Sequence, residues 1–179
     1  MKKKSELYPH VTYEKWKTPV SDIPTHELHL GGVLQACFQV FFFLYQGKKH
    51  HEETHVLSIT RAFPYRIMDE EYADSGIDRY LKYKDPYKKR PKKDSKPWPT
   101  WKFWNTDMIK ELDEGWALSG YRKPNYKNII HYMVATGDDT IEFISPVPRW
   151  EMHRDIKVEK LIGVYLKKRY REHFGDASK

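Results

Sequence analysis

One segment of the chain, residues 80–104, alternates basic and aromatic side chains in a pattern that could bind an anion. Its stretch 82–102 holds nine lysines and arginines and two aspartates, so its net charge equals the +7 of the whole chain. Cationic side chains neutralise phosphates and flat rings stack on bases, and the two together bind single-stranded nucleic acid. We therefore expect this basic arm to engage an anionic partner, either nucleic acid or an acidic protein surface. The residues expected to make the contacts are Lys88, Lys89, Arg90, Lys92, Lys93, Trp98, Trp101 and Trp104.

The basic arm also has a purely structural interpretation. Four prolines, at positions 86, 91, 97 and 99, exclude a long helix, so the arm is predicted to be a loop or an extended segment. The acidic stretch 69–78 lies directly before it and could balance its charge, while its tryptophans cover the core. Residues 88–93 also resemble a nuclear localisation signal, a short pattern that often arises by chance.

An alternative hypothesis is a small enzyme that acts on a phosphorylated or nucleotide-like substrate, with the arm as a lid. His55 and His131 each begin an apolar stretch and would act as acid or base, with Arg61 or Arg66 on the phosphate. The pair resembles the two-histidine phosphoesterases only loosely. Those enzymes place a hydroxyl side chain two residues after each histidine, where this chain has Leu57 and Met133. Whether the protein is an enzyme is left open.

Two small groups of histidines and acids could suggest a metal. One is His50, His51 and His55 with Glu52 and Glu53, and the other is His26 and His29 around Glu27. Neither has the spacing of a known zinc motif, and the chain has one cysteine, so no metal site is predicted. Glycine-rich phosphate loops and dinucleotide fingerprints do not occur in the sequence, and no cofactor is predicted. Asp138, Asp139 and Glu142 are interpreted as acids of a hairpin turn.

The composition indicates one folded domain. The chain has 179 residues, of which 32% are charged and 39% hydrophobic, which is typical of a globular protein. Its longest apolar stretch, Val33–Tyr45, is too short to span a bilayer and no signal peptide is recognised, so no membrane association is expected. The lone Cys37 excludes an internal disulfide and favours the cytoplasm. The oligomeric state is left open, including an oligomer in which the arm docks.

Alternation of apolar residues predicts most strands. Residues 33–45 and 56–67 read as two strands of a hairpin, and residues 128–136 and 140–145 as a second hairpin around the turn 137–139. A further strand is predicted over residues 116–121. Helices are predicted from Thr106 and Asp107 to Gly115, and from Asp155, as the capping residue, to Phe174.

These elements predict an α+β fold. We expect a mainly antiparallel sheet of about five strands, a C-terminal helix packed on one face, and a long basic loop. Residues 1–25, with three prolines, are expected to form an irregular lead-in. The single domain is then predicted to cover residues 26–179, with the basic arm at 80–104.

Overall fold

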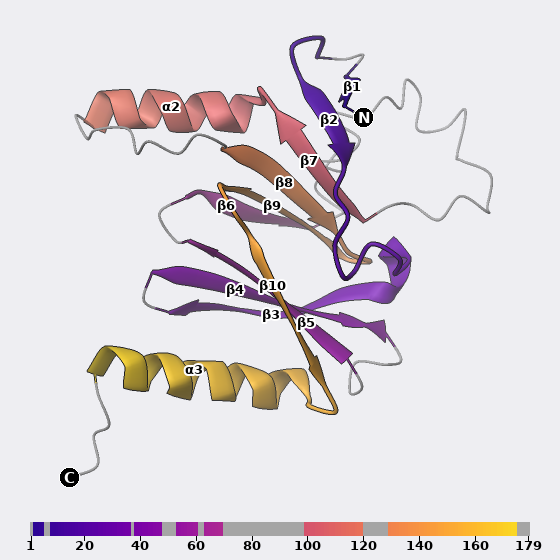
Figure 1. Cartoon of the computed structure of the whole chain (residues 1–179), viewed down its shortest axis with the longest axis vertical. Coiled ribbons are helices and arrows are strands. Elements are labelled where there is room, and N and C mark those ends of the chain that lie inside the picture. The colour runs from indigo at the N-terminus through magenta and orange to yellow at the C-terminus, as the bar shows by residue number, and fades with distance from the viewer. Residues whose placement is uncertain are drawn as a thin grey trace.

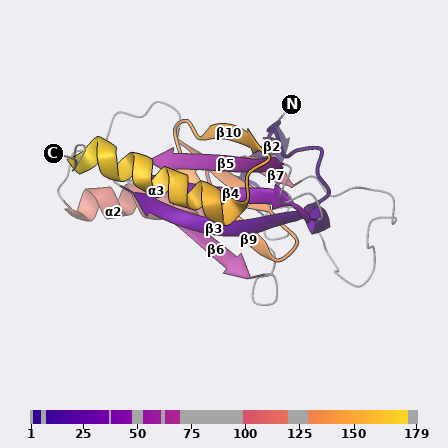
Figure 2. The same cartoon turned by 90° about the horizontal axis from the view of Figure 1, so that it is seen from below.

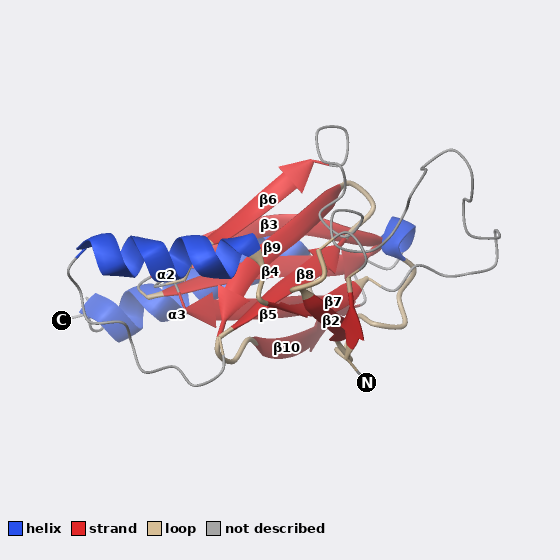
Figure 3. Ribbon diagram, turned by 90° about the horizontal axis from the view of Figure 1, so that it is seen from above, coloured by secondary structure: helices blue, strands red, loops and turns tan. Residues whose placement is uncertain are grey.

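The protein is built from four layers, in the order helix, sheet, sheet, helix (Figure 1). The computed structural model describes residues 2–5, 8–36, 38–47, 53–60, 63–69, 99–119 and 129–174. Helix α2, Asp107–Ser119, covers the outer face of the first sheet, and helix α3, Val158–Phe174, covers the outer face of the second (Figures 2 and 3). No helix among the described residues is long and apolar enough to cross a membrane.

The first sheet has six antiparallel strands in the order β1-β2-β7-β8-β9-β6. They are β1 (Lys3–Lys4), β2 (Thr12–Lys15), β7 (Thr100–Trp104), β8 (Ile130–Ala135), β9 (Asp139–Ser145) and β6 (Tyr65–Asp69). One edge of this sheet therefore comes from the N-terminal segment, which pairs with the strand that follows residue 99.

The second sheet has four antiparallel strands in the order β10-β5-β4-β3. They are β10 (Arg149–Arg154), β5 (Glu53–Thr60), β4 (Gln39–Gln46) and β3 (Leu28–Ala36), and a short 3-10 helix, η1 (Thr25–Glu27), leads into β3. Because six strands face four, the two sheets cannot cover each other completely.

Strand β4 shows how the sequence builds the layers. Successive side chains of a strand point to opposite faces. Its even positions, Val40, Phe42 and Leu44, lie in the core between the sheets, and its odd positions, Phe41 and Phe43, lie in a second core under α3. Both faces of this strand are therefore buried, which explains why it reads as a nearly continuous apolar run.

The predicted α+β class is confirmed, with antiparallel strands and a C-terminal helix on one sheet face. The single sheet of about five strands is wrong, because the described strands form one sheet of six and another of four. The predicted hairpins β4–β5 and β8–β9 are both present. The basic loop lies mostly outside the described residues, and its last part, Thr100–Trp104, is a strand rather than a loop.

Residues 33–45 form a hairpin and not the single strand that their alternation predicts. Strands β3 and β4 pair with each other, and Phe38, in the connection between them, is 77% exposed. The connection has neither glycine nor asparagine, so the apolar pattern runs through it without a turn signal. Residues 56–67 also divide, at Pro64, between β5 in one sheet and β6 in the other.

Four smaller differences concern where elements end and which strands are present. Helix α2 continues through Gly115 to Ser119, so residues 116–119 are helical and not part of a strand. Strand β10 follows Pro148 and was not predicted. Residues 1–25 contribute β1 and β2 instead of being wholly irregular. Asp155 has a φ of 55° and lies three residues before α3, so it does not cap that helix.

Gly31 is a point of close approach between β3 and α3. A Cβ atom added there would lie 2.8 Å from Val158 Cγ1 and 3.1 Å from the Tyr45 ring. We expect Gly31→Ala to destabilise the protein by about 1–3 kcal/mol, because overpacking displaces the buried Val158. Gly163→Ala is the control, since a Cβ at Gly163 meets nothing within 4 Å and alanine favours the helix by about 1 kcal/mol. Urea unfolding measures both, and equal effects would contradict this packing.

Candidate functional site

The structure describes two of the eight residues predicted to bind an anion. Trp101 and Trp104 lie on β7, three positions apart, and therefore point to opposite faces of the first sheet. The other six lie outside the described residues: Lys88, Lys89, Arg90, Lys92, Lys93 and Trp98. Their contribution stays a prediction, so the site must be judged from the sheet on which the basic arm ends.

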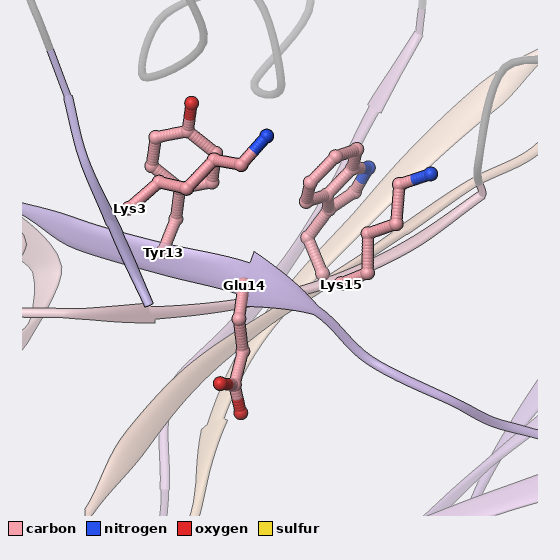
Figure 4. A pocket seen from close by; sticks show the side chains of 5 residues that line it. Lys3, Tyr13, Glu14 and Lys15 are labelled. Carbon is pink, nitrogen blue, oxygen red and sulfur yellow. The ribbon is translucent and has the colours of Figure 1, made fainter. Parts of the chain in front are cut away.

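Trp101 is joined on its face by three side chains from the N-terminal strands. In the sheet, Lys15 pairs with Trp101, Tyr13 with Phe103, and Lys3 with Tyr13. Residues two apart on one strand and residues directly opposite on neighbouring strands share a face. Lys3, Tyr13, Lys15 and Trp101 therefore share one face of the sheet. Figure 4 shows Lys3, Tyr13 and Lys15 projecting to the same side. We call these four residues the basic aromatic surface.

The basic aromatic surface borders a shallow cavity of about 330 Å³, to which Glu14 also contributes. The rings of Tyr13 and Trp101 lie 6.0 Å apart between centroids and are inclined by 64°. Both pack against a buried cluster of Val11, Phe103 and Met133, whose Phe103 projects from the same face beside them. The two partly exposed rings are therefore held against a buried apolar cluster, and the Lys3 and Lys15 side chains beside them are exposed.

The acidic residue of this strand turns the other way. In Figure 4 Glu14 points to the opposite side of β2 from Tyr13 and the two lysines. Its carboxylate lies 3.9 Å from Lys102 Nζ. Trp104 shares that opposite face, where Lys2 Nζ lies 3.8 Å from the centre of its ring. The face of Trp101 therefore presents cations and rings, and the opposite face contains the ion pair and the covered Trp104.

Three residues of this surface were not predicted, namely Lys3, Tyr13 and Lys15. They belong to the stretch interpreted as irregular. The strand pairing that brings them to Trp101 joins residues that are far apart in the sequence. The run from Thr12 to Lys15 is only four residues long, so its alternation is too short to identify a strand. Its basic and aromatic composition is the one signal that could have indicated a shared site.

A second polar cluster lies on the same sheet, beneath α2. Glu142 on β9 is fully buried and ion-paired with Arg66 on β6, and its Oε2 lies 3.8 Å from His131 Nε2. His131 Nδ1 is 3.0 Å from Thr106 Oγ1, just before α2 begins. Glu142 is thus a core residue and not the turn acid that its position near residues 138–139 suggested. Arg66 alone of these groups also lines the cavity of about 410 Å³ between β6 and α2.

Three of the four residues of the enzyme hypothesis are described, and His55 lies apart from His131 and Arg66. His131 and Arg66 come together through Glu142, but both His131 and Glu142 are fully buried. His55 is on β5, in the other sheet. It shares a strand face with Leu57 and Ile59, whose side chains lie in the core between the sheets. Arg61 lies outside the described residues. This arrangement gives no support to joint catalysis by the two histidines.

His55 makes stability depend on pH. Its Nε2 lies 2.9 Å from Glu53 Oε1, but burial dominates and lowers the pKa of His55 below its ordinary 6.5. The fold thus favours the neutral ring, and below about pH 6.5 the unfolded chain binds the extra proton, so stability falls as the pH falls. We expect His55→Leu to lose less unfolding free energy than the unmodified protein between about pH 7 and pH 5. Equal losses in urea titrations at the two pH values would contradict this role.

Comparisons with known proteins identify no relative. No protein-family model matches the chain, and neither a curated protein nor a solved structure is significantly similar to it. Within the part of the chain that the structure describes, no three histidine, cysteine or acidic side chains are grouped so that they could hold a metal ion. The function must therefore be argued from the basic aromatic surface itself.

Proposed function

We propose that this protein binds single-stranded nucleic acid through the basic aromatic surface, extended by residues 82–98 of the basic arm. The observation that carries the proposal is the meeting of Tyr13 and Trp101 with Lys3 and Lys15 on one face of the sheet edge. The arm leads directly into β7, so the charge of residues 82–98 is connected by sequence to the strand that holds Trp101. The lone cysteine of the chain is compatible with a cytoplasmic location.

Two features favour a nucleic acid over an acidic protein surface. Carboxylates need only cations, whereas Tyr13 and Trp101 are partly exposed aromatic residues, and aromatic rings are surfaces on which bases stack. They also favour a single strand, because the bases of a duplex already stack on each other and present only their edges in the grooves. The lysines beside the rings supply the contacts to phosphate, and Glu14 on the opposite face does not oppose them.

Fluorescence anisotropy with a labelled single-stranded oligonucleotide of mixed sequence tests the proposal. We expect binding that weakens as salt rises from about 50 to 200 mM, and weaker binding to the same sequence as a duplex. A polyglutamate probe of similar length distinguishes the acidic-protein alternative. Absence of binding to the single strand at low salt, or tighter binding to polyglutamate, would overturn the proposal.

The two lysines give a quantitative prediction. Each phosphate contact to a single strand contributes about 0.7 to the slope of log affinity against log salt. We therefore expect the double variant Lys3→Ala with Lys15→Ala to reduce that slope by about 1.4. The matched control is Lys4→Ala, because Lys4 is exposed on the same strand as Lys3 but on the opposite face. An unchanged slope in the double variant, or an equal change in the control, would show that these lysines make no phosphate contacts.

A further inference from the structure

Among the described residues, strand β3 is an edge strand that carries neither a charged residue nor a proline. The edge strands of the two sheets are β1, β6, β10 and β3. The first three carry charged residues: β1 consists of two lysines, β6 contains Arg66, and β10 contains Arg149, Glu151 and Arg154. Strand β3 has the sequence LHLGGVLQA, with no Lys, Arg, Asp, Glu or Pro. Natural proteins block exposed edges with charge, proline, short length or β-bulges. Strand β3 has a bulge between Leu30 and Gly32, but from Gly32 to Ala36 it pairs regularly with β4 and carries no charge, so this part of the edge can accept another strand.

The backbone of β3 directs hydrogen-bonding groups outward near its end. Leu28 O accepts a bond from Gly137 N and therefore points away from β4. Outward and inward residues alternate in an antiparallel pair, and the register shifts by one residue between Leu30 and Gly32. Val33 and Gln35 then present their N–H and C=O groups to the open side. Among the described residues β3 pairs with β4 alone.

An apolar row on α3 lies beside this edge. Ile162 packs over β3, since a Cβ added to Gly32 would lie 2.9 Å from Ile162 Cδ1. Leu166 and Tyr170 follow it at intervals of four residues, on the same side of the helix, and are 52% and 55% exposed. Exposed apolar side chains next to an unguarded edge are typical of a protein interface.

We propose that two copies of this chain pair through β3 to form a dimer with twofold symmetry. With Leu34 at the axis, Val33 of one copy faces Gln35 of the other, and each pair exchanges both N–H···O bonds. A second copy fits this edge because an uncharged strand meets its own copy without repulsion between like charges, and the row of Leu166 and Tyr170 is extended by its symmetry mate. The four-stranded sheets of the two copies then form one continuous sheet.

This dimer leaves the basic aromatic surface of each copy open. The Gln35 side chain donates a hydrogen bond to Tyr65 Oη on β6, which places β3 beneath β6. Strand β6 is at the opposite end of the first sheet from β1 and β2. The interface and the basic aromatic surface therefore lie on opposite sides of the molecule, and the dimer is independent of the proposed function.

Sedimentation velocity of the full chain at micromolar concentrations tests the dimer. We expect Gln35→Pro, which removes an outward N–H, to raise the dissociation constant about tenfold or more. Gln35→Leu is the control for the Tyr65 contact, because it keeps the N–H and should still dimerise. Leu166→Glu should weaken the dimer and Val164→Glu, 47% exposed on the other side of α3, should not. Thermal unfolding checks that each variant is folded. A monomeric unmodified protein, or a dimer that folded Gln35→Pro and Leu166→Glu variants retain at full strength, would overturn the proposal.

Discussion

Replacing Trp101 by alanine is expected to weaken binding of a single-stranded oligonucleotide by about 1–3 kcal/mol, or roughly five- to 150-fold. The indole is partly exposed beside Tyr13 and is held against the buried cluster of Val11, Phe103 and Met133, so it can stack on a base with little loss of its own freedom. Anisotropy titrations at fixed low salt measure the change. Quenching of tryptophan fluorescence on binding, reduced in the variant, provides a second signal of stacking.

Two further variants separate stacking from folding. Trp104→Ala removes a tryptophan from the same strand but from the opposite face, where Lys2 covers the ring, so binding should change little. Tyr13→Leu keeps apolar packing against Phe103 while removing the second ring surface, and should also weaken binding. If Trp104→Ala costs as much affinity as Trp101→Ala, the two faces of β7 are equivalent and the proposed surface is wrong.

Replacing Arg66 by methionine is expected to destabilise the protein by about 3 kcal/mol, the lower end of the range for breaking a buried ion pair. Glu142 is fully buried and forms an ion pair with Arg66. Methionine keeps the length of the side chain but leaves the carboxylate without that counter-charge in the core. The lower end applies because Arg66 itself is 39% exposed. Chemical denaturation at neutral pH gives the free energy of unfolding.

The matched experiment removes both charges. In the double variant Arg66→Met with Glu142→Leu, no uncompensated carboxylate remains, so much of the lost stability should return. Such a recovery would show that the isolated charge, and not lost packing, causes the destabilisation of Arg66→Met. A double variant that is less stable than the unmodified protein by the sum of the losses measured for Arg66→Met and Glu142→Leu separately would contradict this account of the cluster.

The elements that were predicted correctly are those whose sequence signals lie close together in the chain. The hairpin β8–β9 and the helix α2 were predicted because alternation, turn residues and capping lie within a few residues of each other. The hairpin of β3 and β4 was missed because its connection lacks turn residues. The division into two sheets was missed because alternation shows that a strand buries one face but does not show to which sheet the strand belongs.

The candidate site was predicted in part for the same reason. Trp101 was identified because it stands in a basic and aromatic run. Lys3, Tyr13 and Lys15 reach it only through pairing between β1, β2 and β7, which no local pattern encodes. Glu142 was misassigned because a single buried acid in a strand is recognisable only when its partners, Arg66 on β6 and His131 on β8, are brought beside it.

The most direct test of the central claim is to locate the nucleic acid on the protein. Ultraviolet light cross-links bases to aromatic rings that touch them, and mass spectrometry of the digested complex identifies the residue. With a single-stranded oligonucleotide and the full chain, we predict cross-links on Tyr13 or Trp101. Efficient cross-linking that leaves both of these residues unmodified would contradict the claim that the basic aromatic surface binds single-stranded nucleic acid.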